Sequence, residues 1–162
     1  MPTERQYGYV QIILVGIVAL ILQIGFVPML EIGVWRPDLI ILVVIYAGFK
    51  LGVMPGTLIG FFLGVLADLF GPGPVGISAL GASIVGFLAG QFRPLKLAYN
   101  AQLLSGIILI LVYGLIFYYI YQLQVDATYL YMIFSRVFPN TIYTFMIGFF
   151  LSLFFRSKLE SL

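Results

Sequence analysis

The chain has 162 residues, of which 62% are hydrophobic and 9% charged, and its formal net charge is +2. Cysteine and histidine are both absent, which excludes disulfides and thiolate metal sites and removes the commonest general base, so we expect no enzyme activity. No segment carries a phosphate-loop or nucleic-acid signature, so we expect no cofactor, no metal and no nucleic-acid partner.

Apolar runs of about the length that spans a bilayer recur from end to end, separated by clusters of charge, proline and glycine. In chain order, the predicted spans cover residues 10–30, 38–49, 55–70, 77–92, 103–121 and 137–155. We interpret the first as a retained span because bulky residues follow it where a signal cleavage site would need small ones. The sequence predicts an all-α polytopic membrane protein, with six transmembrane helices in one compact bundle and a single domain over residues 1–162.

The second to fourth spans are short. As helices they reach about 18 to 24 Å, less than the roughly 30 Å hydrocarbon core, so either they extend further or longer helices enclose them. The longest polar stretch, residues 122–136, is predicted to be an outer loop. Its Tyr129, Tyr131 and Phe134 lie on the outer leaflet or against a partner.

Basic residues set the orientation. Six spans place both termini on one side, and termini in the cytoplasm leave only Arg36 and Arg136 outside, as the positive-inside rule favours. The basic residues then inside are Arg5, Lys50, Arg93, Lys96, Arg156 and Lys158. Four of them also suit contact with anionic lipid or an acidic partner, although the rule alone explains them: Arg93, Lys96, Arg156 and Lys158.

The third and fourth spans carry small residues at four-residue intervals. The first row is Gly52, Gly56, Gly60 and Gly64, and the second is Ser78, Ala82, Gly86 and Gly90. Small residues let helix backbones approach closely in lipid, so we expect a glycine-rich hairpin. The rows either pack these helices against neighbours within the chain or form a groove for the transmembrane helix of a partner.

Asp68 is an acidic residue inside this otherwise apolar hairpin, at the negative end of its helix, so it needs hydrogen-bond donors. Candidate donors are the N–H groups of Gly71, Gly73 and Gly76, the hydroxyl of Ser78, and the free N–H groups that begin the fourth span. Two roles stay open. Asp68 either fixes the connection between the two helices or acts as a proton-coupled or ligand-binding carboxylate.

Two further polar clusters lie at span ends. Arg36-Pro37-Asp38 opens the second span, where proline suits a first turn and aspartate caps the helix. Near the start of the sixth span lie Arg136, Pro139, Asn140 and Thr141, and the last two can hydrogen-bond across helices. On the predicted orientation Asp38, Asp68, Arg136 and Asn140 all lie toward the outer face, where they line one cavity or form a packed polar cluster without a ligand.

Taken together, these motifs resemble the bacterial rod shape-determining protein MreD family over nearly the whole chain. The matching motifs are Arg36-Pro-Asp-Leu, Gly56-x-x-x-Gly-Phe-x-x-Gly-x-x-x-Asp68-Leu, Gly-Pro-x-Gly-x-x-Ala79-Leu, Gly86-x-x-x-Gly90 and Arg136…Pro139…Tyr143.

The resemblance implies a multi-pass protein of the bacterial cytoplasmic membrane that is a scaffold of the elongasome, the machinery of side-wall peptidoglycan synthesis. It implies direct binding to MreC and, through the complex, to the actin-like MreB, the polymerase RodA and a class B penicillin-binding protein. Membrane lipids are expected contacts, and whether the chain forms a homodimer stays open.

The MreD family is similar in fold to the substrate-binding S components of energy-coupling-factor transporters. This similarity supplies an alternative function, a solute-binding or vitamin-binding membrane subunit with the outer polar cluster as its pocket. Such subunits use an Ala-x-x-x-Ala row in the first helix, whereas the first span here contains only Ala19.

Overall fold

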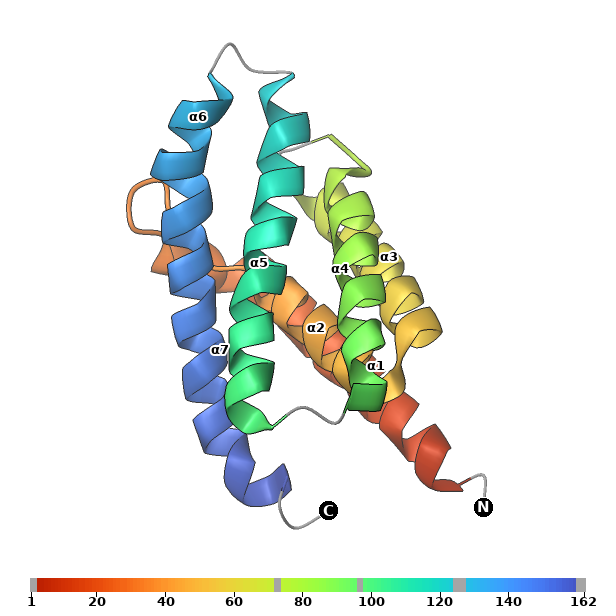
Figure 1. The fold of residues 1–162 in the computed structure, drawn as a ribbon. Coiled ribbons are helices and arrows are strands. Elements are labelled where there is room, and N and C mark those ends of the chain that lie inside the picture. Colours follow the sequence, from red (N-terminus) through yellow and green to blue (C-terminus); the bar gives the residue numbers. More distant parts are fainter. Residues whose placement is uncertain (1–2, 72–73, 96–97, 124–127, 160–162) are drawn as a thin grey trace.

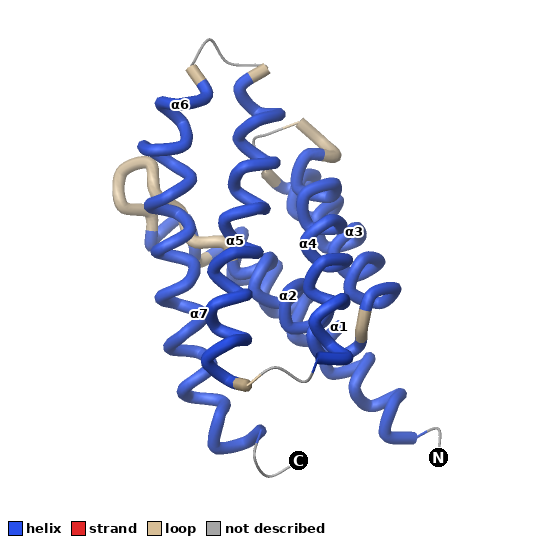
Figure 2. Tube along the Cα trace, viewed as in Figure 1, coloured by secondary structure: helices blue, strands red, loops and turns tan. Residues whose placement is uncertain are grey.

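The computed structural model describes residues 3–71, 74–95, 98–123 and 128–159, and within them every regular element is a helix apart from one isolated bridge between Ile32 and Trp35. Figures 1 and 2 show the arrangement. The elements are α1 (Thr3–Gly25), the 3₁₀ turn η1 (Val27–Leu30), α2 (Leu39–Leu51), α3 (Val53–Phe70), α4 (Ile77–Phe92), the 3₁₀ turn η2 (Arg93–Leu95), α5 (Tyr99–Gln122), α6 (Tyr129–Met132), the π-helix η3 (Ile133–Val137) and α7 (Phe138–Leu159).

The expectation of an all-helical chain is confirmed, and the helix limits follow the sequence closely in places. The fourth predicted span, residues 77–92, coincides with α4. The third begins two residues earlier than predicted and gives an 18-residue α3. By length and composition, three helical stretches in the described parts of the chain suffice to cross a membrane: Gly8–Gly25, Val53–Phe70 and Tyr99–Gln122.

The short second span is enclosed by the others. Helix α2 has 13 residues, and seven of them are buried. Val44 and Ala47 have no exposed surface at all, and α1, α3, α4, α5 and α7 all contact this helix. An apolar helix that is buried on nearly every side needs no full bilayer length, because other helices surround it.

The prediction of an outer loop at residues 122–136 is wrong for the second half of this segment. Residues 129–137 are helical and lead without interruption into α7. Pro139 is responsible for the error, because proline normally lies in the first turn of a helix. Here it is the second residue of α7, and the helical chain already runs through the π-helix η3 before it.

The glycine rows bring α3 and α4 into backbone contact. A Cβ added at Gly60 would lie 2.4 Å from the carbonyl oxygen of Ala82, and one at Gly64 would lie 2.4 Å from the Cα of Ala79. From the other side, a Cβ at Gly86 would lie 2.2 Å from the carbonyl oxygen of Gly56. Any side chain at these positions would force the two helices apart.

Helix α2 joins the same contact. A Cβ at Gly48 would lie 2.5 Å from the Ala89 Cβ, and one at Gly90 would lie 2.3 Å from the Cα of Val53. Gly52 has a φ of 99° and is the whole connection between α2 and α3, which is a conformation that glycine adopts readily. The small residues therefore pack three helices of this chain against one another.

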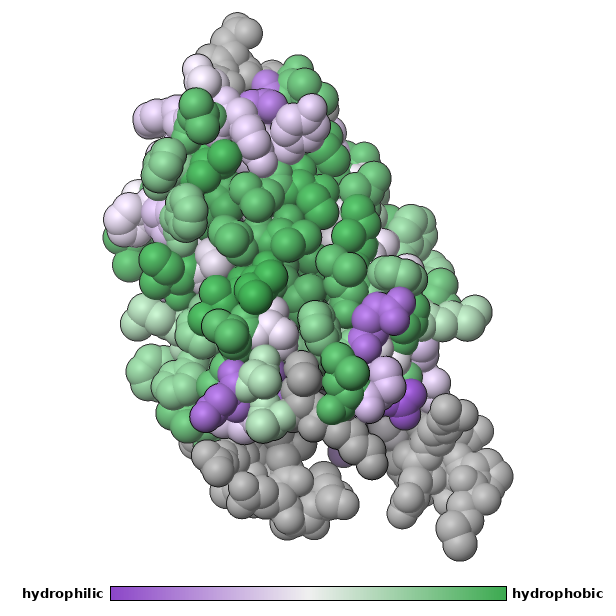
Figure 3. Space-filling view, viewed as in Figure 1, coloured by the Kyte–Doolittle hydropathy of each residue, from purple (hydrophilic) through white to green (hydrophobic). Residues whose placement is uncertain are grey.

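Both ends of the described chain lie at the same end of the bundle, where α1 begins and α7 finishes (Figure 1). Figure 3 shows apolar side chains covering the middle of the face formed by α4, α5 and α7, with polar residues gathered toward its two ends. This distribution is typical of a surface that meets lipid.

Candidate functional site

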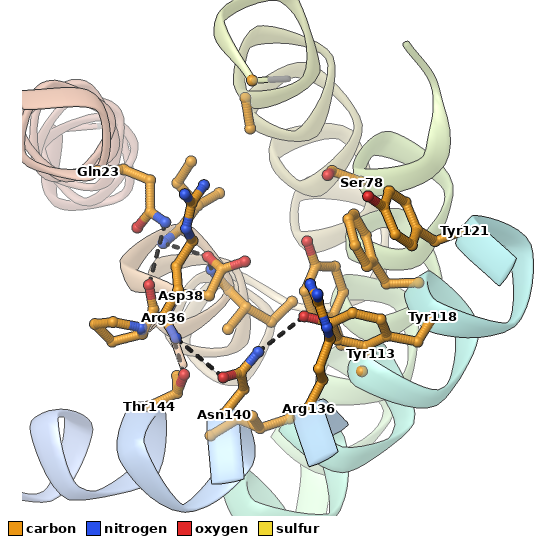
Figure 4. Close-up of a pocket in the computed structure, with 18 of the residues that line it drawn as sticks. Gln23, Arg36, Asp38, Ser78, Tyr113, Tyr118, Tyr121, Arg136, Asn140 and Thr144 are labelled. Carbon is orange, nitrogen blue, oxygen red and sulfur yellow. Dashed lines mark hydrogen bonds between the residues drawn. The ribbon is translucent and has the colours of Figure 1, made fainter. Parts of the chain in front are cut away.

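The start of α1 and the end of α7 lie at one end of the bundle, and a cavity of about 610 Å³ lies toward the opposite end. Its walls come from α1, the loop between η1 and α2, and from α2, α3, α4, α5, η3 and α7 (Figure 4). The volume falls within the range of about 300–1,000 Å³ that small-molecule sites occupy.

The structure brings most of the predicted polar residues to this one cavity. Its lining includes Arg36, Asp38, Asp68, Ser78, Arg136 and Asn140. Pro139 does not line it. The four residues that the sequence placed toward one face, Asp38, Asp68, Arg136 and Asn140, thus surround a common space rather than a closed polar core.

Asp68 caps helix α4 from the end of α3. Its carboxylate accepts hydrogen bonds from the backbone N–H groups of Gly76 at 2.7 Å, Ser78 at 3.1 and 3.2 Å, and Ala79 at 3.3 Å. Only 7% of its surface is exposed. The Gly71 N–H and the Ser78 hydroxyl, both candidate donors, do not donate to it, and Gly73 lies outside the described residues.

Asp38 is the N-cap of α2. Its Oδ1 accepts the N–H groups of Ile40 at 3.0 Å and Ile41 at 3.1 Å. Its own N–H donates to the hydroxyl of Thr144 on α7 at 3.0 Å. The carboxylates of Asp38 and Asp68 therefore each face the positive end of a helix, where a negative charge is stabilised.

The start of α7 holds the loop that precedes α2. We call the contacts of Ser135, Asn140, Tyr143 and Thr144 with residues 30–38 the loop clasp. Tyr143 donates to the carbonyl of Leu30 at 2.8 Å, Asn140 Oδ1 accepts the N–H of Arg36 at 3.0 Å, and the Trp35 indole donates to the Ser135 carbonyl at 3.0 Å. These bonds fix one wall of the cavity against another.

Several polar side chains of the cavity were not expected there from the sequence, among them Gln23, Tyr113, Tyr118 and Thr144. Gln23 donates to the Pro37 carbonyl at 3.2 Å and accepts the N–H of Leu39 at 2.8 Å, which ties α1 to the start of α2. Tyr118 accepts the amide of Asn140 at 2.9 Å, and the phenol of Tyr113 interacts with Asp38 and Ser78.

A sequence signal existed for some of them. Tyr113 lies in the middle of the fifth apolar run rather than at its end, where a tyrosine would serve as a membrane anchor. Gln23 interrupts the first apolar run in the same way. A polar group in the middle of an apolar span needs a partner, and here the partners lie in the cavity wall.

The two arginines of the cavity differ in their partners. Arg36 forms an ion pair with Glu31, and both side chains are partly exposed. Arg136 lies against the hydroxyl of Tyr118, and it pairs with none of the acidic residues that the structure describes. Arg36 and Arg136 both act electrostatically on Tyr118, so positive charge gathers at that side of the cavity.

Within the described residues, no group of three or more histidine, cysteine, aspartate or glutamate side chains comes together to hold a metal ion. Asp38 and Asp68 lie near enough to interact electrostatically, but each already accepts backbone N–H groups. The arrangement suits binding of a polar or charged group rather than proton transfer between two free carboxylates.

Comparison with known families decides what kind of protein carries this cavity. The family model of the rod shape-determining protein MreD matches residues 3–161. The chain belongs to this family. The resemblance drawn from the sequence motifs is therefore confirmed, whereas searches of curated proteins and of solved structures found no significant match.

Membership of the MreD family gives the chain a role in rod shape determination, in a family of structural rather than catalytic proteins. Together with the three long apolar helices, it indicates an integral membrane protein. The cavity and the loop clasp are thus features of a shape-determining membrane protein.

Proposed function

We propose that this MreD-family chain is a non-enzymatic scaffold of the elongasome in the bacterial cytoplasmic membrane. It binds MreC directly and joins MreB, RodA and a class B penicillin-binding protein through the complex, and so helps to organise side-wall peptidoglycan synthesis. The observation that carries this proposal is the family match over residues 3–161. A scaffold is also consistent with the tight packing of the helices and with Asp38 and Asp68, whose carboxylates each accept backbone N–H groups.

In this proposal the chain crosses the membrane six times with both termini in the cytoplasm. The shared location of the α1 start and the α7 end supports an even number of crossings. The cavity end, with Arg36 and Arg136, then faces outward, and Lys50 and Arg93 lie at the inner end. The short helix α2 crosses inside a ring of longer helices.

The packing of the glycines narrows where a partner helix can bind. A leucine at Gly60 or Gly86 would clash with the backbone of the neighbouring helix within this chain. Such variants test the fold of the α3–α4 pair before they test a complex. We therefore expect MreC to contact exposed apolar side chains on the outside of the bundle, and not the glycine rows.

Co-expression with the MreC of the same organism tests the proposal. A tag on this chain is expected to recover MreC through detergent purification, and native mass spectrometry should show one defined stoichiometry. An unrelated single-span membrane protein with the same expression level is the matched control. Recovery of folded chain without MreC, judged by its thermal unfolding in detergent, would contradict direct binding.

The alternative of a solute-binding transporter subunit has less support. Its docking row of alanines is absent from α1, and the family match points to shape determination. The cavity is compatible with both functions, so it does not favour the alternative.

A further inference from the structure

The cavity carries one charge that the fold itself does not use. Asp38 and Asp68 each accept the backbone N–H groups of a helix N-terminus, and Glu31 pairs with Arg36. Arg136 is different, because it lies against the hydroxyl of Tyr118 and forms an ion pair with none of the acidic residues that the structure describes. A guanidinium that keeps donors uncommitted in a cavity is suited to bind the oxygens of a phosphate or carboxylate.

The surroundings of Arg136 favour the same sign of charge. Arg36 also acts on Tyr118, so two guanidinium groups lie on that side of the cavity. Asp38 and Asp68 act on Tyr113 instead, and helix N-termini offset the charge of these two carboxylates. An acidic group that enters the cavity therefore meets attraction beside Tyr118 without displacing an existing ion pair.

Part of the cavity rim is apolar. Ile24 on α1 and Phe70 on α3 both line it, although 42% and 63% of their surfaces are exposed. Phe117, one turn of α5 from Tyr113 and adjacent to Tyr118, adds an aromatic wall, and its ring stacks on that of Tyr121 with the centroids 6.0 Å apart. A ligand that lies against Ile24 and Phe70 and also pairs with Arg136 has both an apolar and an acidic part.

We propose that this cavity is a binding site for an amphiphilic anion, whose phosphate or carboxylate oxygens pair with Arg136 and whose apolar part lies against Phe117, Ile24 and Phe70. The site does not depend on the binding of MreC. A membrane lipid with an acidic headgroup and a soluble amphiphilic phosphate share this chemistry, and the experiment below separates them.

The full-length chain, purified in detergent and stripped of lipid, is exposed to equal amounts of dioleoyl phosphatidylglycerol and dioleoyl phosphatidylcholine, and bound lipid is counted by native mass spectrometry. The variants are Arg136→Gln in the cavity and Lys50→Gln, which removes one positive charge at the opposite end of the bundle. Wild type is expected to retain phosphatidylglycerol about tenfold better than phosphatidylcholine, the size of effect that one charged hydrogen-bonded pair supplies. Arg136→Gln should lose this preference, and Lys50→Gln should keep it.

A second arm uses hexyl phosphate in lipid-free detergent, with the shift in thermal unfolding temperature as the readout. Stabilisation that depends on Arg136, without a preference between the two lipids, identifies a soluble amphiphilic anion as the ligand. If wild type shows neither lipid preference nor stabilisation by hexyl phosphate, the proposal is overturned. It is also overturned if Lys50→Gln weakens binding as much as Arg136→Gln does, since that result describes non-specific attraction to charge. Should Arg136→Gln unfold early, Arg136→Lys, which keeps the charge, must restore at least part of the preference.

Discussion

Asp68 stabilises the start of one helix from the end of the one before it. The carboxylate accepts three N–H groups that α4 cannot satisfy internally, those of Gly76, Ser78 and Ala79. The first four N–H groups of any helix lack partners within the helix, and a buried set without acceptors costs free energy. Gly76 makes this possible because its φ of 110° turns the chain back into the carboxylate.

Replacing Asp68 by alanine is expected to lower the free energy of unfolding by about 3 kcal/mol, since it removes charged hydrogen bonds and leaves buried N–H groups unpaired. For a chain of this size the midpoint of thermal unfolding should then fall by about 5 to 10 °C. Thermal unfolding in detergent, followed by circular dichroism, measures the shift.

Glu31→Gln is the matched control for Asp68→Ala. It also removes one carboxylate from the cavity rim, but the ion pair that it breaks is partly exposed, so we expect a change below about 1 kcal/mol. An unchanged melting temperature in Asp68→Ala, with lost binding of a ligand, would instead assign this carboxylate to ligand recognition.

Residues of this kind differ in how well a sequence reveals them. Asp38 and Asp68 are charged groups in apolar runs, and the cost of burying a charge predicts that each has partners. The sequence predicted the cap at Asp38 and included the Gly76 N–H and the first N–H groups of the fourth span among the candidate donors to Asp68. It could not exclude the Gly71 N–H or the Ser78 hydroxyl, because only the path of the chain selects among the candidates. Tyr113 and Gln23 were overlooked since an uncharged polar residue costs less to bury and therefore gives a weaker signal.

Pro139 shapes the element that closes the cavity. Proline has no N–H, so it cannot donate to the carbonyl of Ser135 four residues earlier, and its ring also crowds that carbonyl. The π-helix η3 lies just before the proline, and in it the N–H of Phe138 donates to the carbonyl of Ile133. The freed Ser135 carbonyl accepts the indole of Trp35 instead. A proline in α7 thereby creates an attachment point for the loop before α2.

This account predicts that Trp35 and Pro139 are energetically coupled. Trp35→Phe keeps an aromatic ring but removes the donor, and it should cost about 1 kcal/mol. In a Pro139→Ala background the new N–H at residue 139 can reach the Ser135 carbonyl, so Trp35→Phe should cost less there. A double-mutant cycle, with unfolding in detergent as the readout, should return a coupling of about 0.5 to 1 kcal/mol. Strictly additive losses would show that the indole bond does not depend on the proline.

The contact between α3 and α4 offers a second test at the same scale. Gly86→Ala places a methyl group 2.2 Å from the Gly56 carbonyl, so it should destabilise the chain by about 1 to 3 kcal/mol as the helices separate. Gly106→Ala is the matched control, because nothing lies within 4 Å of its added Cβ and α5 gains a better helix former. Equal melting temperatures for the two variants would mean that the backbones of α3 and α4 are not in contact at Gly86.

The spacing of the small residues predicted these two helices as close neighbours, since small residues every four positions have few other uses in an apolar helix. The sequence could not show that α2 enters the same contact through Gly48. Gly48 lies four residues before Gly52 and so continues the first row, but it belongs to the second predicted span, and its contact appears only when α3 and α4 are placed beside α2. The helix at residues 129–137 was missed for a related reason, because Arg136 within it and Pro139 just after it favour a loop when only local signals are used.

At the scale of the whole molecule, the proposed topology makes the two ends of the bundle chemically distinguishable. The chain contains no cysteine, so each introduced thiol is the only one that a maleimide can label. Lys50, in the last turn of α2, and Leu123, at the end of α5, lie at opposite ends of the bundle, and Leu123 is 73% exposed. With both termini in the cytoplasm, Leu123→Cys should react with a membrane-impermeant maleimide in spheroplasts. Lys50→Cys should react only after the membrane is permeabilised.

The basic residues at the Lys50 end favour this orientation because positively charged segments are retained in the cytoplasm. The reverse pattern of labelling would invert the protein and place the cavity inside the cell, whereas labelling of both thiols from outside would mean that the number of crossings between them is even.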